Sequence, residues 1–103
     1  MNEDCQFLFM TNNDSYYHRR RPNKNALDVV EVMKRLSAKY DAVCWDLFGV
    51  MGGLNSISLW EDAGLAKADK VHFTKAGYQL NSDLLFWALW ADYERHLKSL
   101  PSW

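Results

Sequence analysis

A chain of 103 residues forms at most one small domain. Its composition, 49% hydrophobic and 24% charged, is that of a globular protein and excludes a disordered tail. Twelve Lys and Arg residues against thirteen Asp and Glu residues leave a net charge of -1, so no overall field attracts nucleic acid or an anionic membrane. No run approaches the roughly 20 apolar residues of a membrane-spanning helix. We therefore expect a small-molecule or protein partner, no nucleic acid and no membrane span.

The first part of the chain predicts a strand, a loop and a helix. Residues 6–11 form a short, almost continuous apolar run that ends in the turn-forming cluster 12–15, as in a strand of a parallel sheet buried on both faces. A polar connection with three arginines follows at 19–24, where Pro22 argues against a helix. Apolar residues then recur at helical spacing behind an asparagine cap: Val29, Met33, Leu36 and Tyr40, with Asn23 or Asn25 as the cap.

A second strand and a short helix are predicted next. Residues 40–48 have an apolar centre and are followed by Gly49 and the pair at 52–53, which predicts a strand that ends in a flexible loop. Residues 56–63 are expected to form about two helical turns before Gly64 ends them. Strand, helix, strand, loop and helix in this order indicate an open α/β sheet with helices on both faces.

The C-terminal part predicts one long helix. Thr74 is a plausible cap, and the helix reaches about Leu97 with an apolar face so wide that it must pack deeply. We expect Trp45, Trp87 and Trp90 in the core. Trp60 is instead a candidate substrate-binding residue, because an exposed indole can stack on a sugar ring. Cys5 and Cys44 are expected to be free thiols rather than a disulfide or a metal site.

A carboxylate three residues before an imidazole is the feature that carries chemistry. In a loop, Asp69 can accept the proton on one ring nitrogen of His72 and leave the other nitrogen as a general base. A nucleophilic hydroxyl needs such a base near neutral pH, and the carboxylate stabilises the imidazolium that forms. The spacing alone is common and does not establish catalysis.

The residues around this pair resemble a known family. The stretch Asp69-x-x-His72-Phe73-Thr74-x-x-Gly77-Tyr78 is similar to the last conserved block of the SGNH/GDSL-type hydrolases, which are GDSL-like lipases, acylhydrolases and bacterial esterases. Weaker similarity extends from about residue 5 to about residue 97, through segments at 13–16, 45–47, 51–53 and 56–65.

The resemblance implies a fold, an activity and a site. It implies that residues 1–103 are the C-terminal portion of a three-layer α/β/α, flavodoxin-like SGNH domain with parallel strands, whose N-terminal part is missing. It also implies an ester hydrolase, with a carbohydrate O-acetyl esterase among the candidates, in which His72 and Asp69 are catalytic and no cofactor or metal is needed. The substrate is then a small-molecule or carbohydrate ester.

This chain departs from the family where the nucleophile should be. A family member carries its serine in a Gly-Asp-Ser context, followed by a Gly and an Asn that help to form the oxyanion hole, and neither block is found here. Asn13 in Thr11-Asn12-Asn13-Asp14 is a candidate oxyanion donor and substrate-binding residue, although a turn that ends the strand is the simpler interpretation. The chain alone is therefore expected to be inactive.

The missing strands would leave an open sheet edge and an uncovered apolar face. We accordingly expect a homodimer or a complementing N-terminal half as the partner. The segment Met1–Asp4 lacks the features of a signal peptide, and the resemblance is compatible with a secreted or periplasmic full-length parent.

Two other hypotheses stay open. In the first, the chain is a non-catalytic remnant or interaction module of α/β type. In the second, it is an unrelated α/β binding module in which the spacing of Asp69 and His72 is accidental. The unrelated module would be favoured by side chains that lie far apart or by a His72 buried among apolar groups.

Overall fold

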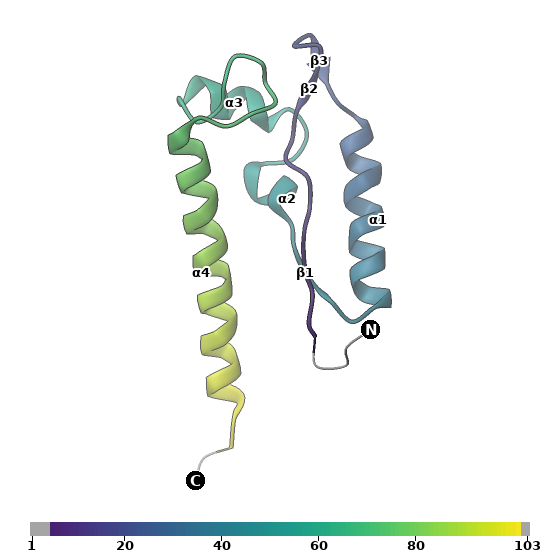
Figure 1. Cartoon of the computed structure of the whole chain (residues 1–103), viewed down its shortest axis with the longest axis vertical. Helices are drawn as coiled ribbons and strands as arrows, with labels where there is room; N and C mark the ends of the chain where they lie inside the picture. Colours follow the sequence, from purple (N-terminus) through teal and green to yellow (C-terminus); the bar gives the residue numbers. More distant parts are fainter. Residues whose placement is uncertain (1–4, 102–103) are drawn as a thin grey trace.

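The computed structural model describes residues 5–101, so Met1–Asp4 lie outside it. Figure 1 shows two long helices on either side of a short sheet, with smaller elements gathered at one end of the molecule. The elements, in chain order, are β1 (Leu8–Met10), β2 (Tyr16–Tyr17), β3 (Arg21–Pro22), α1 (Asn25–Lys39), β4 (Val43–Trp45), α2 (Leu47–Met51), α3 (Ser56–Asp62) and α4 (Lys75–Ser99).

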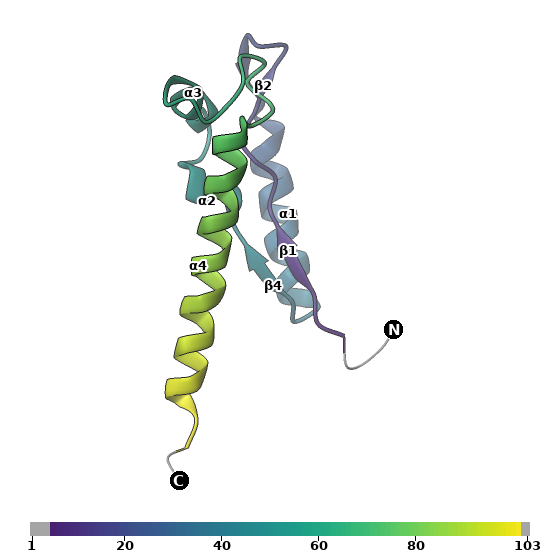
Figure 2. The same ribbon diagram turned by 60° about the vertical axis from the view of Figure 1, so that its left-hand side comes forward.

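The predicted parallel pairing is confirmed. Strand β1 pairs with β4 in parallel, with Leu8 opposite Val43 and Met10 opposite Trp45. Helix α1 connects the two strands and packs along the sheet, while α4 runs on the other side and diverges from it (Figure 2). The mixed α/β class with a parallel sheet is therefore correct, whereas a three-layer flavodoxin-like arrangement stays a prediction.

The polar connection contains a small hairpin that the sequence did not predict. Strands β2 and β3 pair antiparallel, with Tyr17 opposite Arg21. His18 and Arg19 turn the chain in the left-handed region, at φ 51° and 61°. Glycine or asparagine usually marks such a turn, so the sequence carried no signal for it.

Local capping groups set several element ends. Thr74 Oγ1 accepts the Gly77 N–H at 3.2 Å and starts α4, as predicted. The predicted strand 40–48 is too long, because the Asp46 side chain accepts the Gly49 N–H at 3.0 Å and begins α2 instead of a flexible loop. Helices α1, α3 and α4 otherwise lie where the sequence places them.

The core is concentrated at the end of the molecule where α2, α3 and the start of α4 meet. Its main cluster of buried residues is Leu47, Met51, Ile57, Trp60, Ala66 and Phe73. Partly buried Leu80 and Leu84 bring α4 against this cluster. A second cluster joins α1 to α2 through Ala26, Val30 and Phe48.

The deep packing predicted for α4 is wrong, as is the burial of both faces of β1. Within the described part of α4 only Gly77 is buried, and Trp87 and Trp90 are exposed by 62% and 45%. Leu8 and Met10 of β1 are about half exposed. Apolar side chains surround α4 on several sides, but the rest of the described chain covers only its first turns.

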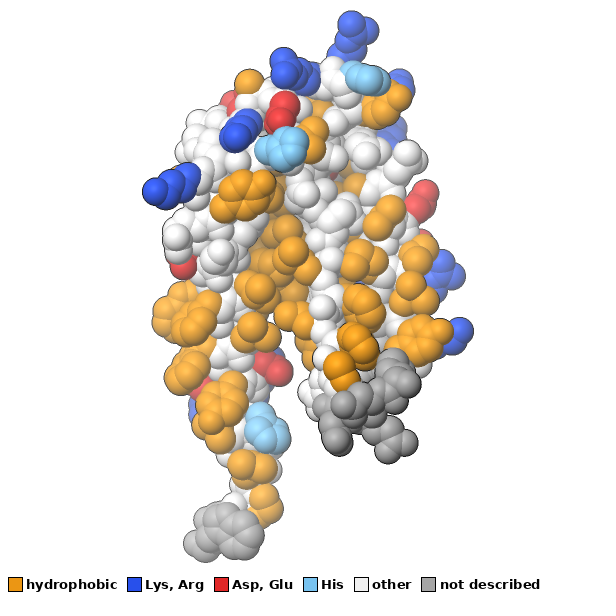
Figure 3. All heavy atoms as spheres, in the orientation of Figure 1, with side chains coloured by type: hydrophobic (Ala, Val, Ile, Leu, Met, Phe, Trp, Pro, Cys, Tyr) orange, Lys and Arg blue, Asp and Glu red, His pale blue; other side chains and the backbone are white. Residues whose placement is uncertain are grey.

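Hydrophobic side chains consequently cover much of the surface over α4, β1 and α1 (Figure 3). The accessible surface is 7868 Å², against about 6,000 Å² for a compact protein of this mass. The radius of gyration is 16.2 Å, where about 13 Å is usual for this length. None of the helices in the described part of the chain has the length and apolarity needed to cross a membrane.

Candidate active site

A closed loop carries both predicted catalytic residues. Ala66 and Phe73 form an antiparallel bridge at its base, and both side chains are buried in the main core cluster. Across the loop, the Lys67 N–H donates to the His72 carbonyl at 2.8 Å. The core therefore anchors the loop at both ends and leaves its tip, with Asp69 and His72, on the surface.

Two hydrogen bonds join Asp69 to His72 in this loop, and Asp69 accepts a third from Val71. The Asp69 Oδ2 atom lies 2.6 Å from Nδ1 of the His72 ring. Oδ1 accepts the backbone N–H groups of Val71 at 2.9 Å and His72 at 3.0 Å. Bonds to the backbone and the ring of His72 and to the backbone of Val71 hold the pKa of Asp69 well below its usual range, because they favour the charged carboxylate.

This geometry fixes the orientation of the imidazole. An ionised carboxylate only accepts hydrogen bonds, so Nδ1 of His72 is the donor. In the neutral imidazole, Nε2 is then the nitrogen with the free lone pair. The His72 side chain is 63% exposed, so Nε2 can reach another molecule. The side chains are neither far apart nor buried, so neither of the two arrangements that would favour an unrelated module is found.

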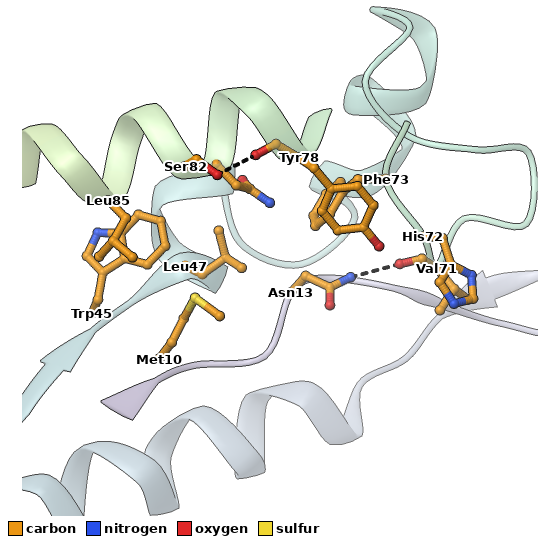
Figure 4. Close-up of a pocket in the computed structure, with 11 residues that line it drawn as sticks. Met10, Asn13, Trp45, Leu47, Val71, His72, Phe73, Tyr78, Ser82 and Leu85 are labelled. Atoms are coloured by element: carbon orange, nitrogen blue, oxygen red, sulfur yellow. Dashed lines mark hydrogen bonds between the residues drawn. The ribbon is translucent and has the colours of Figure 1, made fainter. Parts of the chain in front are cut away.

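An apolar groove of about 470 Å³ opens beside His72. Figure 4 shows it between the start of α4 and the ends of β1 and β4. Its lining is mainly hydrophobic with four polar side chains, and it comprises Met10, Asn13, Trp45, Leu47, Val71, His72, Phe73, Tyr78, Asn81, Ser82 and Leu85. A larger hollow of about 700 Å³ lies at the β2–β3 hairpin, lined by Tyr17, His18, Arg20 and Arg21, and contains neither member of the pair.

Asn13 lies close to the pair, but its amide is engaged. Nδ2 donates to the Val71 carbonyl at 3.0 Å and to the Asp14 carbonyl at 2.8 Å. These two bonds use both amide hydrogens, so none is left for a substrate oxyanion in this arrangement. Asn13 instead connects the turn after β1 to the loop that carries His72 (Figure 4).

Trp60 lies in the core and not on a substrate-binding surface. It is 8% exposed, its Nε1–H donates to the Met51 carbonyl at 3.1 Å, and its ring packs on Phe73 with centroids 5.3 Å apart. Its contact with Phe73 supports the residue that follows His72. The sequence-based assignment is therefore wrong for Trp60, Trp87 and Trp90, whereas Trp45 is partly buried against the core.

Three supporting residues escaped sequence analysis. The Asp14 side chain is fully buried and its Oδ2 accepts the Ile57 N–H at 2.9 Å, which connects the turn after β1 to α3. Thr11, 1% exposed, joins β1 to Asp46 after β4. The Lys70 ammonium lies 2.5 Å from Glu61 of α3. Only the position of Thr11 and Asp14 at the end of a predicted strand hinted at a role.

The chemistry-bearing residues outside this loop are dispersed. Within residues 5–101, no group of three or more His, Cys, Asp and Glu side chains is placed to hold a metal ion. Cys5 and Cys44 are free thiols.

A solved structure of a peptidoglycan O-acetylesterase is similar to this chain, with a TM-score of 0.79 over 92% of its residues. The chain shares the fold of this esterase. Sequence identity is 22%, and the match covers 27% of the esterase chain, so this chain spans about a quarter of its length. No protein-family model matches the sequence, and no curated protein matches it. The esterase-like fold was an expectation from the Asp69–Tyr78 stretch and now stands on structural similarity.

Proposed function

We propose that this chain supplies the base and its orienting partner to the Ser-Asp-His triad of an SGNH/GDSL-type ester hydrolase. The observation that carries the proposal is the 2.6 Å contact between Asp69 Oδ2 and His72 Nδ1, with the ring exposed beside an apolar groove. Its occurrence on a fold shared with an esterase supports the assignment. The proposed substrate is a small-molecule or carbohydrate ester, with an O-acetylated carbohydrate as the leading candidate.

The proposed mechanism uses His72 twice. Nε2 takes the proton of a serine hydroxyl as its oxygen attacks the ester carbonyl, and then gives that proton to the departing alcohol. Water hydrolyses the acyl-serine with the same base. Asp69 stabilises the imidazolium in both steps, and its low pKa keeps it ionised throughout.

The nucleophile is proposed to come from elsewhere. Among the described residues, no serine hydroxyl or cysteine thiol is hydrogen-bonded to His72. Ser82 lines the groove, but its hydroxyl donates to the Tyr78 carbonyl of its own helix at 3.1 Å. The Asp69–His72 pair therefore needs a serine on another segment of polypeptide.

We assign that segment to the uncovered surface beside β1. A strand at the edge of a sheet presents unpaired backbone N–H and C=O groups to another strand, and β1 has β4 as its sole partner in the described chain. A further parallel strand on the free edge of β1 would end at the same side of the sheet as Asn13, next to His72. The whole chain exposes about 1,900 Å² more surface than a compact monomer of its mass, whereas a specific interface needs only about 800 Å² from each partner.

An esterase assay with 4-nitrophenyl acetate tests the proposal. The chain alone should give no turnover above the buffer rate. Co-expressed with an SGNH-type N-terminal segment that carries Gly-Asp-Ser, it should hydrolyse the ester, and His72→Ala should abolish the reaction. Turnover by the chain alone that His72→Ala removes would disprove an external nucleophile. A folded complex without turnover would exclude the hydrolase.

A second candidate is a non-catalytic interaction module, which the exposed apolar surface of α4 favours. It predicts a complex that forms with the same segment and shows no turnover. The His72→Ala variant would then bind the segment as tightly as the unmodified chain.

A further inference from the structure

The contact between Asp69 and His72 depends on one reversal of the backbone. Lys70 lies between Asp69 and Val71 and adopts a φ of 56°, in the left-handed region that side chains with a Cβ rarely occupy. This reversal brings the N–H groups of Val71 and His72 to a single oxygen of Asp69. Something must hold a residue other than glycine in this conformation.

The Lys70 side chain is held from two sides. Its ammonium lies 2.5 Å from Glu61 Oε2 and 3.4 Å from Ser58 Oγ, both on α3. On the other side it lies 5.0 Å from the centre of the Tyr16 ring, at a distance suited to a cation–π contact. The backbone repeats the connection, because the Tyr16 N–H donates to the Lys70 carbonyl at 2.8 Å.

The ion pair of Lys70 with Glu61 is more shielded from water than the pair of Arg95 with Asp92 on α4. The side chains of Lys70 and Glu61 are 21% and 29% exposed, whereas those of Arg95 and Asp92 are 74% and 71% exposed. Exposed pairs contribute little because water and salt screen them, while a partly buried pair with further contacts holds one geometry. The ammonium can therefore act on the conformation of its own backbone.

We propose that Lys70 is a positioning residue, whose ammonium is held between Glu61 and Tyr16 and thereby keeps the left-handed turn that sets Asp69 against His72. The inference rests on the proposed function only for the statement that the orientation of Asp69 against His72 serves catalysis. Lys70 itself touches no reacting atom. The charge of the ammonium and the length of the side chain are the properties that matter.

The test measures the pair directly, in the chain without a nucleophile. NMR titration of the Asp69 carboxyl carbon gives its pKa, and the Nδ1 proton signal of His72 reports the hydrogen bond. In Lys70→Met and in Glu61→Gln the pKa of Asp69 should rise toward its ordinary value of 3.8, and the Nδ1 signal should weaken. Lys70→Arg should preserve both.

Matched controls separate the contact from a general loss of charge. Lys67→Met removes a lysine charge from the same loop, at an exposed position, and should leave the pKa of Asp69 unchanged. Asp92→Asn breaks the exposed ion pair on α4 and should also have no effect. If Lys70→Met does not fold, Glu61→Gln keeps Lys70 in place and decides the question.

The proposal is overturned if folded Lys70→Met or Glu61→Gln retains both the low pKa of Asp69 and the Nδ1 signal. It is equally overturned if Lys67→Met raises that pKa as much as Lys70→Met does. Neither result affects the proposed hydrolase. Conversely, a complex without esterase activity would exclude the hydrolase. The positioning role of Lys70 would still hold if Lys70→Met raised the pKa of Asp69 and weakened the Nδ1 signal of His72.

Discussion

Replacing Thr11 by valine should destabilise the chain more than its size suggests. The two side chains have nearly the same shape, but the Thr11 hydroxyl makes two hydrogen bonds in a buried setting. It donates to Asp46 Oδ1 at 3.1 Å and accepts the Phe48 N–H at 3.0 Å. Thr11→Val removes both bonds and leaves the buried Phe48 N–H without its partner.

A hydrogen bond to a charged group contributes about 1.5–3 kcal/mol and an unsatisfied buried donor costs about 1–3 kcal/mol. The expected cost is about 2–4 kcal/mol, toward the lower end of their sum, because the Asp46 side chain is 31% exposed and keeps Lys34 and Gly49 as partners. This is a large part of the total for a domain that is stable by about 5–15 kcal/mol. The position matters for the site, since Thr11 precedes the turn whose Asn13 binds the His72 loop.

Urea unfolding followed by far-UV circular dichroism, at one fixed protein concentration, measures this cost. Thr11→Ser is the matched control, because it keeps the hydroxyl and deletes only the methyl group. The reasoning is refuted if Thr11→Ser loses as much free energy of unfolding as Thr11→Val, since packing of the methyl group would then dominate.

Three further predictions concern the loop and the surface. Gly77→Ala should strongly lower the melting temperature, because the new Cβ would lie 1.9 Å from the Leu65 carbonyl oxygen. An unchanged melting temperature would refute the close approach of α4 to the Leu65 backbone. The stability that Asp69 contributes is present above its ordinary pKa of 3.8 and is lost as the pH falls through its lower folded-state pKa. Acid urea titrations should show this loss in the wild type and not in Asp69→Asn. Without its partner segment the chain should sediment as a dimer or larger species at micromolar concentration. Trp87→Glu should restore the monomer, whereas the control Leu59→Glu, at a similarly exposed position on α3, should leave the association unchanged. A compact folded monomer of the unmodified chain would contradict this prediction.

Local signals explain what the sequence predicted well. The helix cap at Thr74, the glycine after α3 and the helical spacing along α1 all act within a few residues, so the element boundaries follow from them. The Asp69–His72 contact is local for the same reason, because its members are three residues apart. The parallel pairing of β1 with β4 follows from the helix between them.

Long-range packing explains what the sequence did not predict. The burial of Trp60 and the exposure of Trp87 depend on which other elements are present, and periodicity within a helix carries no such information. The contact of Lys70 with Glu61 joins a loop to α3 through two charged residues that would each be expected on the surface. Hydrogen-bond saturation of Asn13 likewise appears only when the loop is folded.

The short sequence distance between base and orienter also determines how an active enzyme would assemble. Closing a loop of three residues costs little entropy, and the contacts of Lys70 with Glu61 and Tyr16 come from this same chain, so Asp69 and His72 meet without help from the docking segment. Docking of the serine-bearing segment then joins two preorganised halves, and the base is not built at the interface. Catalytic competence should accordingly rise in proportion to the fraction of chain bound, with no slow maturation step after association.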